Sequence, residues 1–300
     1  MTGFAAALDE GPLVLDGGLS NELEALGADL GDALWSARLL ADDPALVRAA
    51  HAAYLRAGAQ VLITASYQAS FEGFARRGAT RAEARRLLRR SVGLAREAAE
   101  EAGGERVFVA GSVGPYGAVL ADGSEYTGRY GLSTRELADF HRPRVEALAE
   151  AGPDVLALET VPSAAEAEAL LVASEGCGLP VWLSFTASGG RTRTGEPLGE
   201  ALALAAGVEQ VAAVGVNCCT VQEATRALPL AAEHAGKPGV VYPNSGEGWD
   251  ADRRAWSGEP SYDPAAPGLV DGWVSAGARL VGGCCRVGPE RIAAVRRALS

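Results

Sequence analysis

The stretch Leu280-Val281-Gly282-Gly283-Cys284-Cys285-Arg286 is a short apolar run that changes abruptly to cysteine and arginine. An upstream stretch, Gly215-Val216-Asn217-Cys218-Cys219, has the same form, and the two together hold four of the five cysteines. Short apolar, β-branched runs are typical of buried strands. Both stretches therefore predict strands with thiols at their C-terminal ends.

The cysteines at these strand ends predict a metal site. Side chains alternate between the faces of a regular strand, so the adjacent Cys284 and Cys285 could not ordinarily both point at one ion. Gly282 and Gly283 tolerate backbone conformations that other residues disfavour, and we expect them to turn the strand end until both thiols converge. A third thiolate from Cys218 would complete a three-sulfur site with one open position, which is the arrangement of a catalytic zinc.

Two other interpretations of the cysteines stay open on spacing alone. Free cysteine is often buried as a small hydrophobic residue, so the two pairs could be core packing. Alternatively, Cys284 and Cys285 could form a strained vicinal disulfide with a redox role. The spacing does not have the CxxC form of common structural zinc sites.

Eight apolar runs alternate with amphipathic stretches along the whole chain. The expected strands are 13–16, 61–66, 107–112, 155–159, 180–186, 212–217, 239–242 and 279–283. The expected helices include 44–57, 80–102, 134–150, 163–174, 220–235 and 289–299. This alternation predicts an α/β protein, a single-domain (β/α)8 TIM barrel over residues 1–300. An open doubly wound sheet is the structural alternative, but it would usually carry a glycine-rich phosphate turn near its start.

Functional groups follow the strands at their C-terminal ends, where the active sites of TIM barrels lie. Examples are Asp16 after the first strand and Glu159 at the end of the fourth. Two connections on the same side, 115–133 and 245–267, are too long to be simple turns. Loops of this length in a compact domain are usually lids or binding loops.

The composition excludes several classes of partner. The chain has 300 residues, of which 48% are hydrophobic, and a formal net charge of -11. Nucleic acids and anionic membranes both require a basic surface, so neither is expected as a partner. We see no signal peptide at the N-terminus and no apolar run long enough for a membrane span. With an odd number of cysteines, most of them in vicinal pairs, we expect a cytoplasmic protein.

Scarce residues narrow the chemistry further. Lys237 is the only lysine, and the three histidines, His51, His141 and His234, all fall in helical stretches. None of the four is expected at the C-terminal ends of strands, so Schiff-base chemistry and histidine triads are disfavoured. Without a histidine to move protons, binding of a cation such as an amino-acid ammonium is the better role for a carboxylate pair.

The chain resembles the homocysteine S-methyltransferase family over essentially its whole length. The matching motifs are Asp16-Gly17-Gly18, Ile63-Thr64-Ala65-Ser66-Tyr67-Gln68, Gly111-Ser112-Val113-Gly114-Pro115-Tyr116-Gly117, Gly215-Val216-Asn217-Cys218 and Gly282-Gly283-Cys284-Cys285-Arg286. Two more stretches, Ala121-Asp122-Gly123-Ser124-Glu125-Tyr126 and Tyr242-Pro243-Asn244-Ser245-Gly246-Glu247, resemble the branch that uses S-methylmethionine as methyl donor.

The resemblance implies a zinc-dependent enzyme that methylates L-homocysteine to L-methionine. It implies Cys218, Cys284 and Cys285 as ligands of Zn2+, with Cys177 and Cys219 left as packing residues. Asp16 and Glu159 match positions that hold the homocysteine amino group and the neighbouring main chain. Asn244 matches an asparagine that can occupy the fourth zinc position before substrate arrives. The other substrate-binding positions implied are Gly17, Gly18, Thr64, Tyr67 and Asn217.

The methyl donor is less closely defined than the acceptor. Thr160 stands where the betaine-using enzymes carry a tyrosine, which weakens the case for betaine. S-methylmethionine is the expected donor, with S-adenosylmethionine as a second one. Betaine and a folate- or cobalamin-linked donor are the alternatives within the class, and a non-enzymatic zinc or redox sensor is the distant one. The sequence predicts no oligomeric state.

Overall fold

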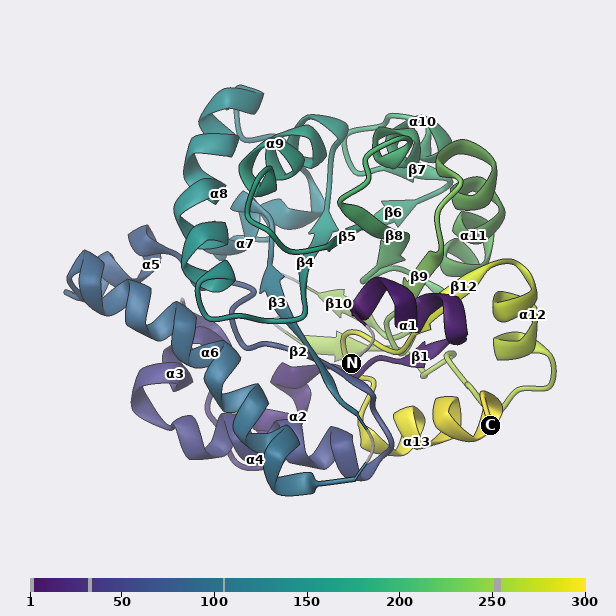
Figure 1. Ribbon diagram of the computed structural model, residues 1–300, viewed down its shortest axis with the longest axis horizontal. Helices are drawn as coiled ribbons and strands as arrows, with labels where there is room; N and C mark the ends of the chain where they lie inside the picture. The colour runs from purple at the N-terminus through teal and green to yellow at the C-terminus, as the bar shows by residue number, and fades with distance from the viewer. Residues whose placement is uncertain (1–2, 32–33, 105, 251–254) are drawn as a thin grey trace.

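Eight parallel strands form the centre of the molecule (Figure 1). The computed structural model describes residues 3–31, 34–104, 106–250 and 255–300. The strands are β1 (Leu13–Val14), β2 (Val61–Ile63), β3 (Phe108–Val113), β4 (Val155–Val161), β5 (Val181–Phe185), β8 (Val211–Asn217), β9 (Gly239–Tyr242) and β12 (Ala278–Val281). Their order is β1-β12-β9-β8-β5-β4-β3-β2. A bridge between Leu15 and Val61 joins the two ends of this order, so the predicted (β/α)8 barrel is confirmed.

Long helices cover the outside of the barrel (Figure 1). The predicted helices are confirmed to within about two residues as α4 (Pro44–Arg56), α6 (Arg81–Ala102), α8 (Thr134–Ala149), α9 (Ala164–Ser174), α11 (Val221–Ala235) and α13 (Pro289–Ala298). Capping boxes start two of them, with Thr80 and Glu83 before α6 and Ser133 and Glu136 before α8. These reciprocal hydrogen bonds satisfy backbone N–H groups that a helix start would otherwise leave free.

Short elements lie between the main ones, several at the strand ends. The helices are α1 (Phe4–Glu10), α2 (Leu19–Ala25), α3 (Leu39–Asp42), α5 (Phe71–Arg76), α7 (Tyr116–Leu120), α10 (Leu198–Leu202) and α12 (Leu269–Ser275). The 3-10 turns are η1 (Trp35–Arg38), η2 (Ser124–Tyr126) and η3 (Ala203–Ala205). Two hairpins pair β6 (Ala187–Ser188) with β7 (Arg191–Thr192), and β10 (Gly248–Asp250) with β11 (Ala255–Ser257).

The two long connections expected from the sequence contain several of these elements. The stretch 115–133 holds α7 and η2, and the stretch 245–267 holds the β10–β11 hairpin. Residues 251–254, between β10 and β11 in the sequence, lie outside the described part of the chain.

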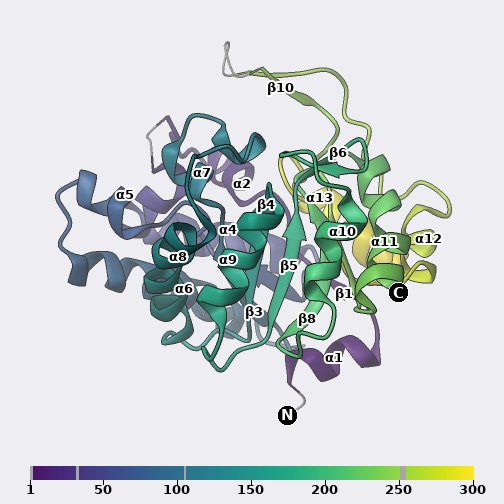
Figure 2. The same cartoon turned by 90° about the horizontal axis from the view of Figure 1, so that it is seen from above.

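Helix α1 closes one end of the barrel, a feature that the strand pattern does not predict. Phe4 and Leu8 are buried in the same cluster as the inward-facing residues Phe108 and Trp182. The ring of Phe4 meets that of Phe108 edge-on, with the centroids 5.4 Å apart. Figure 2 shows α1 at the opposite end of the molecule from the β10 hairpin. Solvent is thus excluded from the N-terminal end of the barrel, and the functional groups gather at the other.

A larger apolar cluster fills the layer between the strands and the outer helices. It includes Leu62, Leu156 and Val214 from the strands and Leu88 and Leu170 from the helices. No helix in the described part of the chain combines the length and the apolar composition that a membrane span requires.

Close contact between β8 and β9 leads to a stability prediction. A Cβ atom added at Gly215 would lie 2.0 Å from the backbone oxygen of Val240 on the neighbouring strand. Gly215→Ala should therefore lower the free energy of unfolding by roughly 1–3 kcal/mol, because paired strands must separate to make room. Gly93→Ala, in α6 with open space around it, should raise stability by about 0.5–1 kcal/mol. Denaturant unfolding measures both, and equal effects would contradict the packing argument.

Candidate active site

Three thiols converge at the C-terminal end of the barrel. The sulfur atoms of Cys218, Cys284 and Cys285 all lie within 4.8 Å of one another, and those of Cys218 and Cys285 are 3.5 Å apart. Such a cluster could hold a metal ion. All five cysteines are free thiols, and the other two, Cys177 and Cys219, pack into the outer apolar layer.

The backbone brings the thiols together in a different way from the one expected. Gly282 and Gly283 are not among the residues with positive φ; the bends come at Cys218, with φ 51°, and at Arg286, with φ 60°. The glycines provide close packing instead, because a Cβ at Gly283 would lie 2.1 Å from the Cγ1 atom of Val287. Backbone strain in a non-glycine residue is often found at functional sites.

Loop residues after β9 hold the cysteine backbone in place. The amide nitrogen of Cys284 donates to the carbonyl oxygen of Pro243 at 2.8 Å. The amide of Cys285 donates to the side-chain Oδ1 of Asn244 at 3.1 Å. The Asn244 side chain therefore bonds to the backbone beside the thiols.

Tyr126 is a residue of the site that sequence reasoning did not single out. Its hydroxyl lies 3.4 Å from the sulfur of Cys218. The pKa of the Cys218 thiol is well below its usual value, because Cys284, Cys285 and Tyr126 hydrogen-bond to its sulfur. Tyr126 belongs to the same short stretch as Glu125, which the family resemblance marked as a motif without giving it a role.

The two predicted carboxylates are buried at the same end of the barrel as the thiols. Asp16 is 1% exposed; its Oδ2 accepts the amide of Ile63 at 2.8 Å, and its Oδ1 is buried without a hydrogen-bond partner. Glu159 is 5% exposed and accepts hydrogen bonds from Ser112 and from Tyr242, the latter at 3.0 Å. Burial raises the pKa of Asp16 well above its usual range and that of Glu159 to about 7. Both sites thus favour a cation that would stabilise the ionised carboxylate.

A buried hydrogen-bond network fixes the position of Glu159. Trp182 Nε1 donates to the hydroxyl of Tyr242 at 3.1 Å, and Ser184 Oγ lies 2.7 Å from the same hydroxyl. Ser184 also donates to Oδ1 of Asn217 at 2.9 Å, which links the carboxylate to the end of β8, directly before Cys218. Asn217 in turn exchanges two hydrogen bonds of 2.7 Å with Thr160.

The remaining predicted residues surround the same end of the barrel. A Cβ at Gly17 or Gly18 would meet a backbone oxygen at 2.1 Å or 2.6 Å, so both positions require glycine for close packing. The hydroxyl of Thr64 accepts the amide of Ser112 at 3.0 Å. Tyr67 hydrogen-bonds to Thr160, and burial, together with nearby negative charges, raises the pKa of its hydroxyl well above the usual value.

The histidines and the lysine lie away from this cluster, as the sequence indicates. His141 on α8 is buried against Glu166 of α9, with Nε2 3.0 Å from its Oε1. Arg144, one turn further along α8, donates to the carbonyl oxygens of Tyr67, Ala69 and Gly114. The hydrogen bonds of Arg144 thus hold the backbone of the loops after β2 and β3 in place.

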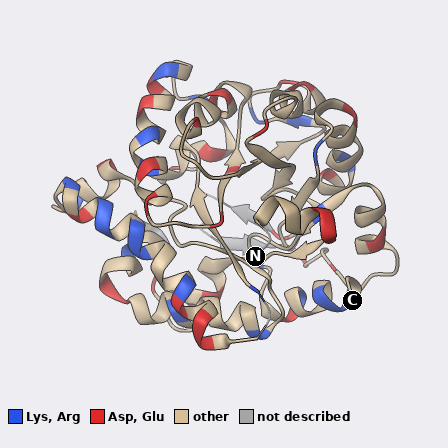
Figure 3. Cartoon of the chain, in the orientation of Figure 1, with Lys and Arg blue, Asp and Glu red and all other residues tan. Residues whose placement is uncertain are grey.

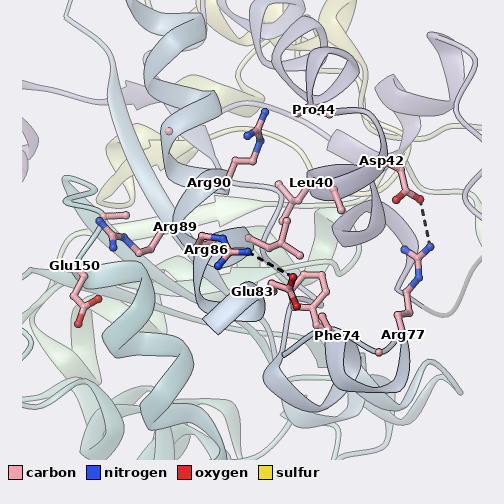
Figure 4. Close-up of a pocket in the computed structure, with 16 residues that line it drawn as sticks. Leu40, Asp42, Pro44, Phe74, Arg77, Glu83, Arg86, Arg89, Arg90 and Glu150 are labelled. Atoms are coloured by element: carbon pink, nitrogen blue, oxygen red, sulfur yellow. Dashed lines mark hydrogen bonds and ion pairs between the residues drawn. The ribbon is translucent and has the colours of Figure 1, made fainter. Parts of the chain in front are cut away.

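A groove of about 1030 Å³ on the outer face is unrelated to the thiol cluster (Figure 4). It lies between α3, α4, α5 and α6, where the arginines of α6 form a blue stretch in Figure 3. Acidic residues in the groove neutralise part of this charge; Arg77 pairs with Asp42 at 3.4 Å and Arg86 with Glu83 at 3.7 Å. The candidate catalytic groups lie at the strand ends instead.

Comparison with known proteins finds one family along nearly the whole chain. The family model described as homocysteine S-methyltransferase matches residues 13–299. The chain is 44% identical to the homocysteine S-methyltransferase YbgG of Bacillus subtilis, over 95% of this chain and 94% of that protein. It is 47% identical to the homocysteine S-methyltransferase of Escherichia coli, over 95% of this chain and 94% of that one.

Solved structures of a homocysteine methyltransferase also match the chain. The crystal structure of the metallated form of the homocysteine methyltransferase MmuM from Escherichia coli superposes with a TM-score of 0.85 at 44% identity, covering 98% of both chains. Its oxidized form gives a TM-score of 0.84. The chain is thus an enzyme of the methyltransferase class, and it belongs to the homocysteine S-methyltransferase family.

Proposed function

We propose that this enzyme transfers a methyl group from S-methylmethionine to the thiolate of L-homocysteine, giving L-methionine, with zinc held by Cys218, Cys284 and Cys285. The observation that supports it best is that three thiols converge near two buried carboxylates, with Glu159 close enough to interact with Cys218 and Asp16 with Glu159. One group of residues suits the sulfur of an amino acid and the other its ammonium. Their combination fits a thiol amino acid as substrate.

The thiol geometry fits a zinc ion. Zn–S bonds of about 2.3 Å in a tetrahedral site place the sulfurs roughly 3.8 Å apart, close to the separations found here. Three protein ligands leave the fourth position for a substrate thiol. A zinc ion bound there would act as a Lewis acid that makes this thiol a thiolate nucleophile at neutral pH.

The carboxylates suit the amino group of homocysteine. The orphaned Oδ1 of Asp16 is a buried acceptor, and burying such an atom costs free energy unless a donor meets it. An α-ammonium would supply donors to Asp16 and Glu159 and stabilise both in the ionised form. The positions proposed to contact substrate are Asp16, Gly17, Gly18, Thr64, Tyr67, Glu159, Asn217 and Asn244.

The methyl-transfer step is balanced in atoms and charge, and it needs no proton transfer at carbon. The homocysteine sulfur forms a bond to the methyl carbon, while the bond from that carbon to the donor sulfonium breaks and its electron pair stays on the donor sulfur. A thiolate and a sulfonium thus become two neutral thioethers. The residues act by holding the reactants in line, which can lower a barrier by up to about 7–11 kcal/mol. S-adenosylmethionine carries the same sulfonium and is proposed as a weaker donor.

Methionine formation by zinc-loaded protein from L-homocysteine and S-methylmethionine tests the proposal directly. We expect turnover that a zinc chelator abolishes and that added zinc restores. Turnover with betaine or a methylated folate alone would replace the proposed donor. Stoichiometric zinc with no turnover, combined with reversible release of zinc by mild oxidant, would support the sensor interpretation instead.

Cys284→Ser should lose both zinc and turnover, because a neutral hydroxyl replaces one of three thiolate ligands. Cys177→Ser is the matched control, since this thiol lies in the turn before β5, where it donates to the carbonyl oxygen of Leu179 and accepts from the side chain of Gln210. We expect it to keep zinc and activity within about twofold. Zinc analysis of both purified proteins measures this, and similar zinc contents would contradict the ligand assignment.

Glu159→Gln should weaken methionine binding more at about pH 8 than at about pH 5.5. The pKa of about 7 means that the wild-type carboxyl is largely protonated at the lower pH and ionised at the higher. Only the ionised form attracts an ammonium, so wild-type affinity should rise roughly tenfold per pH unit below 7 and then level off. Calorimetry with methionine avoids the titration of a substrate thiol. Equal losses at both pH values, or loss of zinc, would assign Glu159 another role.

A further inference from the structure

Glu125 is a buried carboxylate close to the thiol cluster for which the proposed function gives no role. It lies in η2 and is 7% exposed, and its Oε2 is buried without a hydrogen-bond partner in the described part of the chain. The next residue, Tyr126, places its hydroxyl 3.4 Å from the sulfur of Cys218, so Glu125 lies beside the cluster. A buried acceptor without a donor costs free energy that a bound cation would recover.

Arg193 brings a positive charge to the same region from the β6–β7 hairpin. Its Nε and Nη2 donate to the hydroxyl of Thr186 at 3.2 and 3.1 Å, and its backbone amide donates to Pro162 at 2.9 Å. Thr186 donates in turn to the carbonyl oxygen of Cys218 at 3.2 Å. The guanidinium is therefore fixed beside the strand end that carries Cys218.

Tyr126 connects the two charged groups. It follows Glu125 in the chain, and its ring lies 5.6 Å from the guanidinium carbon of Arg193. Its hydroxyl reaches the sulfur of Cys218. Among the described residues, no ion pair joins Glu125 to Arg193, so each charge is available to a ligand. A carboxylate and a guanidinium beside one aromatic ring form a receptor for the two charges of an amino acid.

We propose that Glu125 and Arg193 bind the α-ammonium and the α-carboxylate of the methyl donor, next to Tyr126. This inference rests on the proposed function and deepens it, since it assigns the donor to the sulfonium amino acids. The acceptor has its own proposed carboxylates, Asp16 just after β1 and Glu159 on β4, so the second set of charges suits the second substrate. Betaine has a carboxylate, but its quaternary nitrogen carries no N–H group and so could not donate a hydrogen bond to Glu125.

Three donors separate the contributions of the two groups. S-methylmethionine carries both charges, its amide lacks the carboxylate, and 4-(dimethylsulfonio)butanoate lacks the ammonium. With saturating homocysteine, Arg193→Gln should reduce kcat/KM for S-methylmethionine by roughly 10- to 100-fold, the effect of one charge-assisted hydrogen-bond pair. The same variant should change kcat/KM for the amide by less than about threefold. Glu125→Gln should reduce kcat/KM for S-methylmethionine and for its amide, which carry the ammonium. It should leave kcat/KM for 4-(dimethylsulfonio)butanoate unchanged.

Control variants separate donor binding from support of the site. Arg191→Gln changes an exposed arginine on the same hairpin, which donates to the carbonyl oxygen of Gly195, and should leave all donors unaffected. The KM for homocysteine and the zinc content should stay within about twofold of wild type in both test variants. Arg193→Lys keeps the charge without the two-pronged geometry, so it should recover part of the loss. It also serves as the test variant if Arg193→Gln does not fold.

Calorimetric binding of S-methylmethionine to the zinc-loaded protein provides a readout independent of turnover. Weaker binding by both variants, with selectivity across the three donors, would support the receptor even if another acceptor were used. A wild-type protein that makes no methionine from any donor would contradict the proposed function. An active wild type whose variants lose all three donors equally would overturn only this inference and assign both residues to support of the site.

Discussion

The concentration of acidic groups in a dry barrel end is the constraint on which the site depends. Three thiols and two carboxylates share a region where most of them are buried. Ionising all five there would be very costly, because charges in a low-dielectric medium repel strongly. Most of these groups therefore stay protonated. Burial raises the pKa of Asp16 and Glu159, and only Cys218 of the three thiols has a lowered pKa.

Binding and charge are coupled as a result. A metal ion at the thiols and an ammonium at the carboxylates would each release protons and stabilise the anionic form of their ligands. Two buried acceptor atoms, Oδ1 of Asp16 and Oε2 of Glu125, have no hydrogen-bond donor within the described chain. The site is therefore preorganised to bind cations. Such atoms are rare in folded proteins and are commonly met by a ligand. The sulfonium of a methyl donor is a further cation of the kind that this environment favours.

The fold supplies the rigidity that such a site needs. Every parallel strand points its C-terminal end the same way, so residues far apart in sequence meet at one rim. Helix α1 fills the opposite end with Phe4 and Leu8, which keeps the barrel interior apolar. Non-glycine residues with positive φ occur at the ends of β4 and β8, at Thr160 and Cys218. The hydrogen bonds between Asn217 and Thr160 hold these two strained turns against each other.

The sequence by itself determined the strand and helix order, the barrel, and the gathering of Cys218, Cys284 and Cys285 at one end. Hydrophobic periodicity is a local property, and parallel strands then place their final residues together whatever the details of packing. Only the tertiary structure decided how the thiols converge, through bends at Cys218 and Arg286 rather than at the glycines. It also decided that Tyr126 reaches the sulfur of Cys218 and that Arg193 lies over the Tyr126 ring, because loop conformations arise from contacts between distant segments and leave no periodic signal in the chain.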